Sequence, residues 1–489
     1  MSTVLLSSGA DWGAETSSDE LLDDALWNAA SKAIDYRRTV DDGPLRPDAG
    51  YRDMLAAVDR PLPLHGVAPS AVIDELSTIA EPGLNGMAGA RFFGWVAGGS
   101  HRLGVAADWL TSAWGQNCGN HHAAPAAAAF EEVAGNWLLD VLDLPRESSV
   151  GFVTGATAAN FVCLAAARHA LLAHQGWNVE TKGLFGAPDI SVLVGGDAHA
   201  SVFSALGFLG LGSERVIRIA TDDDGRMLIR SFHEAIERCT GATIVIAQAG
   251  QINTGVFDPF PELAKICASR DQTWLHVDGA FGLWARASHG HADLTRGVEG
   301  ADSWATDGHK WLQVPFDSGY AIVRNRDAHE AAMSISASYL PASSERERNP
   351  TALVPELSRR ARGFATWAMI RHLDRSGIAD MVQRHCRLAR RIARKLAAEP
   401  GIAILNDVEL NQVIVRFGAE AGSQTSDTLT QAVIERLQSD GICFAGGAMW
   451  RDRWVMRLSC SSWATMEADA DRTVEAIIDA WRAIAARVD

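Results

Sequence analysis

The pattern of apolar and polar positions divides the chain into a helical first part and a longer part in which strands alternate with helices. Residues 18–40 place apolar side chains at helical spacing behind an acidic start, and residues 70–83 predict a second, shorter helix. The Pro-rich stretch 60–70 predicts a connector, and the glycine-punctuated aromatic stretch 91–104 predicts a loop. We therefore expect residues 1–110 to form a helical N-terminal segment.

From about residue 110, short β-rich runs alternate with helical stretches. The runs cover residues 150–155, 190–198, 215–220, 242–250, 273–280, 302–308 and 319–324. Strands that alternate with helices predict βαβ units and a mostly parallel sheet, with functional side chains at the C-terminal ends of the strands. We predict a large α/β domain over residues 111–365.

The last part of the chain has a different pattern. Residues 340–362 are polar, charged and Pro-containing, which predicts a mobile loop, and a long helix over residues 367–399 follows. Residues 411–488 then show strand, helix, strand and helix in turn. We predict that residues 366–489 form a small α+β domain.

Composition restricts the classes of function. The chain has 489 residues, 47% hydrophobic and 21% charged, which is typical of a globular protein. Its net charge of −16 disfavours nucleic acid as a partner, because binding to phosphates depends on basic clusters. We find no apolar run that approaches the roughly 20 residues of a membrane span, and no basic region typical of a signal peptide at the start.

The cysteines and histidines give no pattern for a metal or for a disulfide framework. The seven cysteines are scattered without a CxxC motif, which favours a reducing compartment, and we expect a cytoplasmic protein. The histidines at 121–122 and 289–291 are not at i,i+4 spacing with a carboxylate, so we expect no metal.

Residues 151–168 predict a strand, a turn of small residues and a helix. Such a turn leaves backbone N–H groups free at a helix N-terminus, where they favour a phosphate. The candidate groups are Gly155, Ala156 and Thr157. Taken alone the signal is weak, because about half of such turns are plain helix caps, and the turn matches neither a Walker loop nor a dinucleotide fingerprint.

Three further residues lie at or beyond the ends of predicted strands. Asp278 closes the apolar run 273–278, where a buried carboxylate needs a cation such as a protonated pyridine nitrogen. Lys310 follows the next strand and becomes a useful nucleophile if its pKa is lowered by its surroundings. His199 can stack on a planar ring or assist proton transfer, although a helix-capping histidine is the commoner role. A phosphate cradle, a stacking histidine, an acid and a lysine in this order are what a pyridoxal-phosphate site requires.

The chain resembles the pyridoxal-phosphate-dependent group II amino-acid decarboxylases, which include aromatic-amino-acid, glutamate and diaminobutyrate decarboxylases. The matching stretches include "TGATAANFVCLAAAR", "DAHASV", "NTGVFDP", "LHVDGAFG", "DGHKWLQVPFDSG" and "LSRRARG". The resemblance implies the fold type I architecture of aspartate aminotransferase and a homodimer with active sites at the interface. Residues 1–110 would be the dimer-forming segment. It implies pyridoxal 5'-phosphate (PLP) as cofactor and an amino acid as substrate.

The resemblance also implies a role for individual residues. Lys310 would form the Schiff base with PLP, Asp278 would hold the pyridine N–H, and His199 would stack on the ring. The other implied contacts are Ala280 under the ring, Gly155, Ala156 and Thr157 at the phosphate, His309 close to the phosphate, and Trp95 and Gly98 nearest the substrate.

Two departures from the family pattern bear on the reaction. Many relatives have two threonines where this chain has Gln251 and Ile252, so we include Gln251 among the substrate-pocket residues. The mobile loop of the family usually carries a tyrosine that protonates the substrate Cα after CO2 has left. Between Tyr339 and Phe364 this chain has neither an aromatic residue nor a histidine, and Tyr339 aligns before the loop.

The sequence therefore predicts a PLP-dependent decarboxylase that converts an L-amino acid to its amine. Because the loop tyrosine is missing, other PLP reactions stay open: oxidative decarboxylation–deamination to an aldehyde, aldol-type cleavage or transamination. Two further alternatives are an enzyme that uses a Schiff-base lysine without a cofactor and a catalytically silent binding or scaffold subunit.

Overall fold

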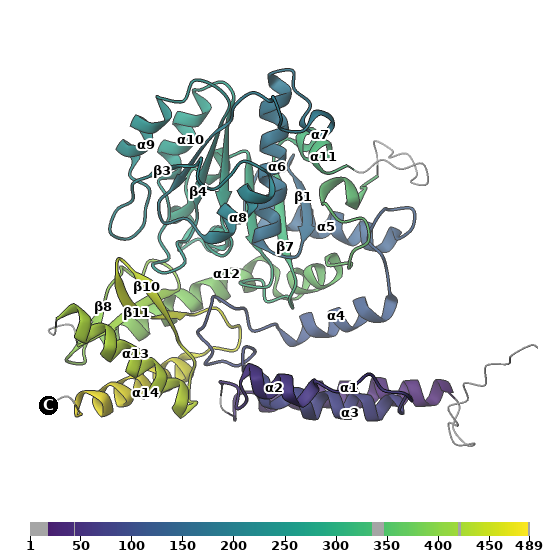
Figure 1. The fold of residues 1–489 in the computed structure, drawn as a ribbon, viewed down its shortest axis with the longest axis vertical. Coiled ribbons are helices and arrows are strands. Elements are labelled where there is room, and N and C mark those ends of the chain that lie inside the picture. The colour runs from purple at the N-terminus through teal and green to yellow at the C-terminus, as the bar shows by residue number, and fades with distance from the viewer. Residues whose placement is uncertain (1–17, 44, 335–346, 419–421, 488–489) are drawn as a thin grey trace, which may run out of the picture.

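The structure, a computed structural model that describes residues 18–43, 45–334, 347–418 and 422–487, is built on a seven-stranded sheet (Figure 1). The strand order is β1-β7-β6-β5-β4-β2-β3. The strands are β1 (Ser149–Val153), β2 (Ser191–Gly195), β3 (Ile217–Ile219), β4 (Thr243–Gln248), β5 (Thr273–Asp278), β6 (Ser303–Asp307) and β7 (Gly319–Val323).

Neighbouring strands run parallel except at β7, which is antiparallel to both β1 and β6. Only residues 308–318 connect β6 to β7, too few for the crossover of a dozen or more residues that a parallel neighbour needs. The predicted α/β class with a mostly parallel sheet is confirmed.

Helices cover both faces of this sheet, so its central strands are buried on both sides, and β2 and β4 carry long apolar runs. One face is covered by α6 (Ala156–His174), α8 (Ala200–Phe208) and α11 (Arg326–Met333), with α7 (Val179–Lys182) beside α6. The other face is covered by α5 (Pro125–Val141), α9 (Ile229–Ile236), α10 (Phe260–Ala268) and the first part of α12 (Gly363–Leu396).

Short 3-10 turns complete the connections. They are η1 (Glu81–Gly83), η2 (Gly282–Ala287), η3 (Ala292–Thr295), η4 (Val298–Gly300) and η5 (Pro350–Leu353).

Helix α6 corrects one expectation from the sequence. It is the one helix of the described ranges that is long and apolar enough, by length and composition, to cross a membrane. However, it packs against α8, α11, β6 and β7, and 61% of its apolar window is buried inside the protein. A helix enclosed on most sides must be apolar around most of its circumference, so this composition is explained by its place in the core.

A second, four-stranded antiparallel sheet has the order β10-β11-β9-β8. Its strands are β8 (Ile402–Ile404), β9 (Gln412–Phe417), β10 (Gly446–Trp450) and β11 (Arg453–Ser459). It packs against α12, α13 (Ser423–Asp440) and α14 (Glu467–Ala485). The long helix and the strands β9 and β11 were predicted, but the short strands β8 and β10 were not.

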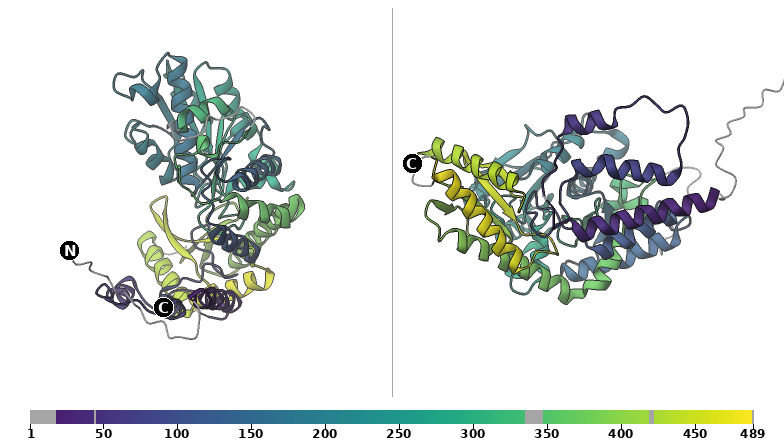
Figure 2. Two further views of the ribbon diagram at one scale, coloured as in Figure 1. Left: turned by 90° about the vertical axis from the view of Figure 1, so that its right-hand side faces the viewer. Right: turned by 90° about the horizontal axis from the view of Figure 1, so that it is seen from below.

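The N-terminal helices extend along one side of the molecule (Figures 1 and 2). They are α1 (Ser18–Thr39), α2 (Tyr51–Val58) and α3 (Pro69–Ala80), and α4 (Arg102–Trp114) leads into the large domain. Helices α1 and α3 lie against each other, yet no described side chain of α1, α2 or α3 is buried. The division of the chain at residues 110 and 365 stays a prediction.

The segment predicted as a mobile loop is partly packed. Residues 335–346, which include Tyr339, lie outside the described residues. The later part is fixed: Pro350–Leu353 forms the buried turn η5. The buried Arg359 guanidinium donates to Glu131 Oε2 at 2.7 Å. The buried turn η5 and this buried ion pair hold the later part of the segment against the large domain. The prediction of mobility was therefore wrong for these parts of residues 347–362.

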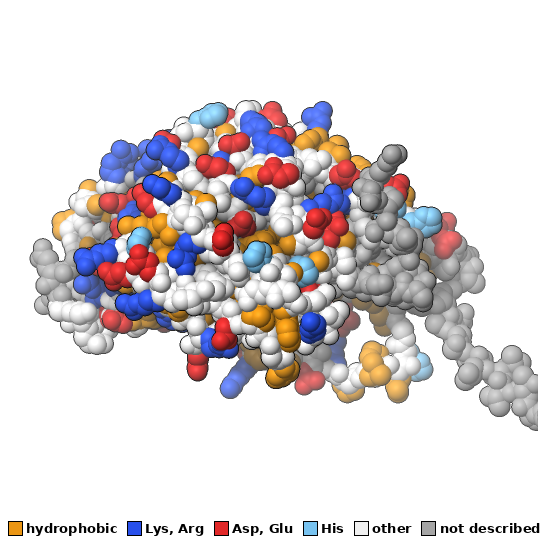
Figure 3. All heavy atoms as spheres, turned by 90° about the horizontal axis from the view of Figure 1, so that it is seen from above, with side chains coloured by type: hydrophobic (Ala, Val, Ile, Leu, Met, Phe, Trp, Pro, Cys, Tyr) orange, Lys and Arg blue, Asp and Glu red, His pale blue; other side chains and the backbone are white. Residues whose placement is uncertain are grey.

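The surface over the large domain carries both signs of charge. On the face seen in Figure 3, Lys and Arg side chains alternate with Asp and Glu among the described residues. This arrangement agrees with the prediction that nucleic acid is not a partner, which stays a prediction.

Candidate active site

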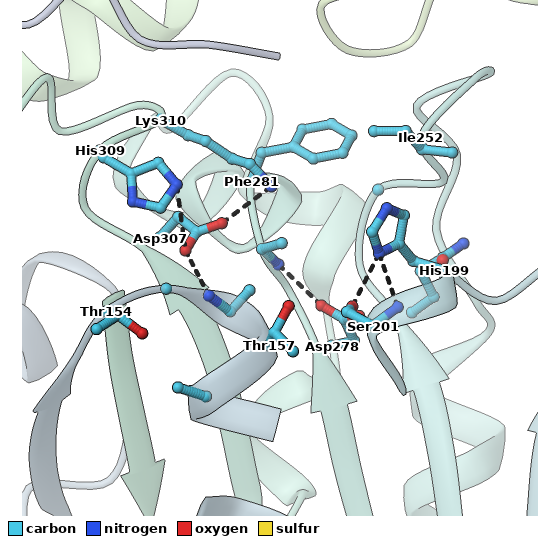
Figure 4. Close-up of a pocket in the computed structure, with 16 residues that line it drawn as sticks. Thr154, Thr157, His199, Ser201, Ile252, Asp278, Phe281, Asp307, His309 and Lys310 are labelled. Atoms are coloured by element: carbon cyan, nitrogen blue, oxygen red, sulfur yellow. Dashed lines mark hydrogen bonds and ion pairs between the residues drawn. The ribbon is translucent and has the colours of Figure 1, made fainter. Parts of the chain in front are cut away.

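A cavity of about 340 Å³ lies at the C-terminal ends of β1, β2, β4, β5 and β6, where parallel strands of an α/β sheet bring functional side chains together (Figure 4). Its walls come from the turn before α6, the start of α8 and the segments that follow β4, β5 and β6. The lining residues are Thr154, Gly155, Ala156, Thr157, Ala158, His199, Ser201, Gln248, Gly250, Ile252, Asp278, Ala280, Phe281, Asp307, His309 and Lys310.

Lys310 reaches the cavity from the turn that follows β6. Its Nζ lies 2.9 Å from Asp307 Oδ2 and 5.9 Å from the centre of the Phe281 ring. The buried Gln313 side chain donates to the Lys310 carbonyl oxygen at 3.0 Å and to the Ser461 carbonyl oxygen at 2.6 Å. The turn that carries the lysine is therefore held by the C-terminal part of the chain.

Asp278 ends β5 and is 4% exposed. Its Oδ2 accepts from Asn160 Nδ2 at 3.2 Å, and its Oδ1 accepts from the Ala280 N–H at 3.2 Å. Burial raises the pKa of this carboxyl above its ordinary value, and His199 and Lys310 oppose the shift. Both hydrogen-bond donors are neutral, so the carboxylate still lacks a directly paired cation among the described residues.

His199 caps the N-terminus of α8 and lines the same cavity. Its Nδ1 accepts from the Ser201 N–H at 3.2 Å and lies 2.8 Å from Ser201 Oγ. Burial lowers the pKa of His199 below its ordinary value, and Asp278 opposes this shift. The ring therefore favours its neutral form more than an exposed histidine does.

The N-terminus of α6 is the predicted phosphate cradle, and one of its donors already has an acceptor. The Ala156 N–H donates to Asp307 Oδ1 at 2.6 Å. Gly155 packs so closely on β7 that a Cβ at Gly319 would come within 2.5 Å of the Gly155 Cα. The imidazole of His309 lies next to this turn, and burial lowers its pKa.

The structure brings most of the predicted residues together. Gly155, Ala156, Thr157, His199, Asp278, Ala280, His309 and Lys310 all line the cavity.

The three predicted substrate residues are outside the cavity lining that the described residues form. Gln251 is 2% exposed and accepts from the N–H groups of Asn253 and Thr254, whereas Ile252 lines the cavity in its place. Gly98 packs on the Lys310 turn, where a Cβ would lie 2.2 Å from the Lys310 carbonyl oxygen. Trp95 is 55% exposed and packs beside Phe444.

Several functional residues were missed from the sequence, above all Asp307, Asn160 and Ser201. Asp307 had a detectable signal, because it is a carboxylate at the end of a buried strand, as Asp278 is. Asn160 lies in the interior of α6 and had no comparable signal, because its partner Asp278 is 118 residues away in the chain.

The residues present fit PLP. The buried Asp278 carboxylate has neutral donors only and suits a protonated ring nitrogen. The backbone N–H groups at the start of α6 suit a phosphate, and the Lys310 amine in the same cavity suits covalent attachment. The one unfavourable feature is Asp307, whose negative charge lies at the phosphate end.

Comparisons with known proteins agree with this reading of the cavity. The chain is 26% identical to an aromatic-L-amino-acid decarboxylase of Bacillus atrophaeus, over 89% of this chain and 90% of that protein. It is 27% identical to an L-2,4-diaminobutyrate decarboxylase of Rhizobium meliloti (strain 1021), over 69% and 67%. It is 24% identical to a 4-hydroxyphenylacetaldehyde synthase of Rhodiola rosea, over 89% and 90%.

Solved structures confirm the fold. The crystal structure of Oryza sativa TDC with PLP and tryptamine superposes with a TM-score of 0.88 and 21% identity, covering 96% of this chain and 99% of that chain. Mouse CSAD gives a TM-score of 0.86 at 19% identity, covering 94% and 98%. The fold type I class is therefore confirmed.

The sequence profile described as the pyridoxal-dependent decarboxylase conserved domain matches residues 52–418, three quarters of the chain and the whole cavity lining. With the lysine, the buried acid and the helix N-terminus placed around one cavity, the cofactor is PLP and the enzyme is a PLP-dependent carboxy-lyase. The chain belongs to the pyridoxal-dependent decarboxylase family.

Proposed function

We propose that this protein removes the α-carboxylate of an L-amino acid as CO2 and releases the corresponding amine. The observation that carries the proposal is the placement of the Lys310 amine and the Asp278 carboxylate around one cavity that the N-terminus of α6 also lines. PLP, when bound, supplies an electron sink that makes loss of CO2 possible.

The residues that line the cavity have different parts in this reaction. Lys310 provides the amine for covalent attachment, and Asp278 holds a proton on the ring nitrogen. The first turn of α6 binds the phosphate through its backbone N–H groups. His199 Nε2, a water molecule or Lys310 Nζ returns a proton to Cα, and both side chains line the cavity.

A second candidate is oxidative decarboxylation–deamination, in which O2 and water are consumed and aldehyde, CO2, ammonia and H2O2 are released. Two observations favour it. The stretch between Tyr339 and Phe364 contains neither a tyrosine nor a histidine that can return a proton to Cα. In addition, one relative of this chain is a 4-hydroxyphenylacetaldehyde synthase, and a crystal structure of that enzyme superposes with a TM-score of 0.84.

A product balance separates the two candidates. The PLP-loaded protein is incubated with a panel of L-amino acids, and CO2, amine, ammonia, aldehyde and H2O2 are measured, with and without O2. Equal amounts of CO2 and amine, unaffected by removal of O2, support simple decarboxylation. Aldehyde and H2O2 that disappear without O2 support the second candidate, and the absence of CO2 with every substrate refutes both.

We also propose that the protein is a homodimer that forms through the N-terminal helices. In α1 the side chains of Leu26 and Trp27 are 70% and 76% exposed, and in α3 Leu76 is 62% exposed. Large exposed apolar surface on helices that bury no described residue of their own is typical of an interface. The same proposal places the active sites of the dimer at the interface between the two chains.

The proposed dimer is tested with Trp27→Glu in α1. Analytical ultracentrifugation should show a dimer for the wild type and a monomer for this variant. Phe185→Glu is the matched control, because Phe185 is 98% exposed and follows α7, which lies at the opposite end of the molecule from α1 (Figure 1). A monomeric wild type, or a dimer that both variants leave intact, refutes this interface.

We propose a cytoplasmic location as well. All seven cysteines are unpaired and buried, which supports a reducing compartment. Fractionation of cells that produce the protein should place it in the cytoplasmic fraction.

A further inference from the structure

Asn160 links the two residues that flank the cofactor position in the cavity. It lies in the second turn of α6 and is fully buried. Its Nδ2 donates to Asp278 Oδ2 at 3.2 Å and to Ser201 Oγ at 3.5 Å, and its Oδ1 lies 2.9 Å from His276 Nε2. The Asn160 amide therefore contacts both the acid and Ser201, the serine that is hydrogen-bonded to His199.

The chemistry of its partners fixes which way this amide points. The carboxylate of Asp278 accepts hydrogen bonds only, so the NH2 group of Asn160 must face it. The carbonyl oxygen of Asn160 then faces His276 Nε2, and this nitrogen must carry the proton.

The next links fix the histidine from the other side. His276 Nδ1, without a proton, accepts from the Ser303 hydroxyl, whose Oγ lies 2.9 Å away. The Ser303 Oγ itself accepts from the donor-only Trp274 Nε1–H at 2.9 Å. Every proton from Trp274 to Asp278 therefore has one position, and all donors point toward the acid.

The second branch leads to His199. Ser201 Oγ accepts the other N–H of the Asn160 amide and donates its own proton to His199 Nδ1, 2.8 Å away. This nitrogen also accepts from the Ser201 N–H, so it carries no proton. His199 therefore holds its proton on Nε2.

Burial makes this network rigid. His276, Ser303 and Asn160 are fully buried, and burial lowers the pKa of His276 to about 3, so its ring is neutral at neutral pH. In such surroundings a reversed amide would place a carbonyl oxygen against the Asp278 carboxylate, and a missing donor would leave that charge less satisfied.

We propose that Asn160 is the positioning residue of this site: its amide, locked by His276, sets the orientation of the Asp278 carboxylate and, through Ser201, of the His199 ring. The inference rests on the proposed function, because it concerns the groups that hold the cofactor ring. Without Asn160, Asp278 has one donor fewer, its proton affinity rises, and a proton moves from the ring nitrogen toward the acid.

The test compares variants of the full chain after removal of the cofactor and reloading with PLP labelled with 15N in the ring. Asn160→Leu removes all hydrogen bonds of the amide at similar volume. His276→Gln keeps an N–H near the position of Nε2, whereas His276→Asn keeps one only near Nδ1 and loses the contact with Asn160. The matched control is His329→Asn, because His329 is also fully buried and is bonded to Ser149 Oγ at 2.8 Å and to the Leu353 carbonyl oxygen at 2.9 Å.

The measured quantities are the 15N shift of the ring nitrogen, which reports its protonation, and the dissociation constant of PLP. Asn160→Leu and His276→Asn should move the shift toward that of neutral pyridine and weaken PLP binding by about tenfold or more. His276→Gln and His329→Asn should stay close to the wild type.

Wild-type shift and affinity in Asn160→Leu would overturn the positioning role, and so would equal effects of the two His276 variants. If Asn160→Leu does not fold, as judged by its thermal denaturation, the two His276 variants decide the question. A wild-type protein that does not bind PLP would refute the proposed function itself, whereas wild-type behaviour of the variants would refute the positioning role alone.

Discussion

Replacing Asp307 by asparagine should strengthen the binding of PLP. The Asp307 carboxylate accepts from the Ala156 N–H at 2.6 Å and pairs with Lys310 Nζ at 2.9 Å. The phosphate of PLP is an anion that needs the same helix N-terminus. The wild-type protein therefore binds the phosphate against a buried negative charge, and the Asp307→Asn variant does not.

The size of the effect follows from charge and burial. Two unit charges separated by about 6 Å at an effective dielectric constant of about 20 repel each other by roughly 3 kcal/mol. The carboxylate is only 3% exposed, so water screens this repulsion poorly. The neutral amide still accepts from Ala156 but holds the turn less tightly, which offsets about 1 kcal/mol. The net gain is about 2 kcal/mol, or roughly thirtyfold in the dissociation constant.

The assay is a titration of cofactor-free protein with PLP, followed by the absorbance of the lysine-bound cofactor and by quenching of tryptophan fluorescence. Asp317→Asn is the control, because it removes the same charge from a carboxylate that is 45% exposed and paired with Arg362. It should change the dissociation constant by less than about twofold. Equal or weaker binding in Asp307→Asn would refute the reasoning and would show that the carboxylate helps to hold the cofactor.

Three further predictions concern the site and the core. Lys310→Ala should abolish turnover and the absorbance of lysine-bound PLP, and borohydride treatment should label Lys310 in the wild type only; an active variant would exclude the proposed role of this lysine. Asp278→Asn should keep the cofactor and lose most of its kcat, because a neutral amide cannot hold a charged ring nitrogen. The NH2 group of the new amide must also face one of the two N–H donors of Asn160 and Ala280, which costs about 1–3 kcal/mol of stability. An unchanged kcat would contradict this. The free energy of unfolding should fall in acid, because burial lowers the pKa of His276, His329 and His385 from 6.5 to about 3. Folded-state pKa values below the unfolded value give stability that is full above pH 6.5 and is lost as the pH falls toward 3, with a slope near pH 5 of about 4 kcal/mol per pH unit for three protons. Urea denaturation at pH 7, 6 and 5 measures this slope, and a free energy that does not change over this range would refute it.

The positions of Asp278 and Lys310 at one cavity were predictable from the sequence. Buried parallel strands appear as continuous apolar runs, and their C-terminal ends meet at one edge of the sheet. Asp278 closes one strand and Lys310 follows the next strand, so the two side chains are expected near each other at this edge for many conformations of the connecting loops. The turn before α6 is on the same edge for the same reason.

The partners of these groups were not predictable. Asn160 contacts an acid 118 residues away, and Asp307 turns back to a helix N-terminus 151 residues away. Gln251 and Ile252 are neighbours in the chain, yet the turn of the backbone directs the first into its own loop and the second into the cavity.

The sequence by itself therefore determined the fold class and the edge of the sheet that carries the site, because local periodicity and strand ends encode them. The cofactor was indicated by the order of the site residues and by the resemblance to a known family. Only the tertiary structure decided which side chain faces which, namely the amide that orients Asp278 and the carboxylate that opposes the phosphate. The physical reason is that hydrogen bonds depend on direction and on tenths of an ångström, which are set by the packing of distant segments and leave no periodic signal in the chain.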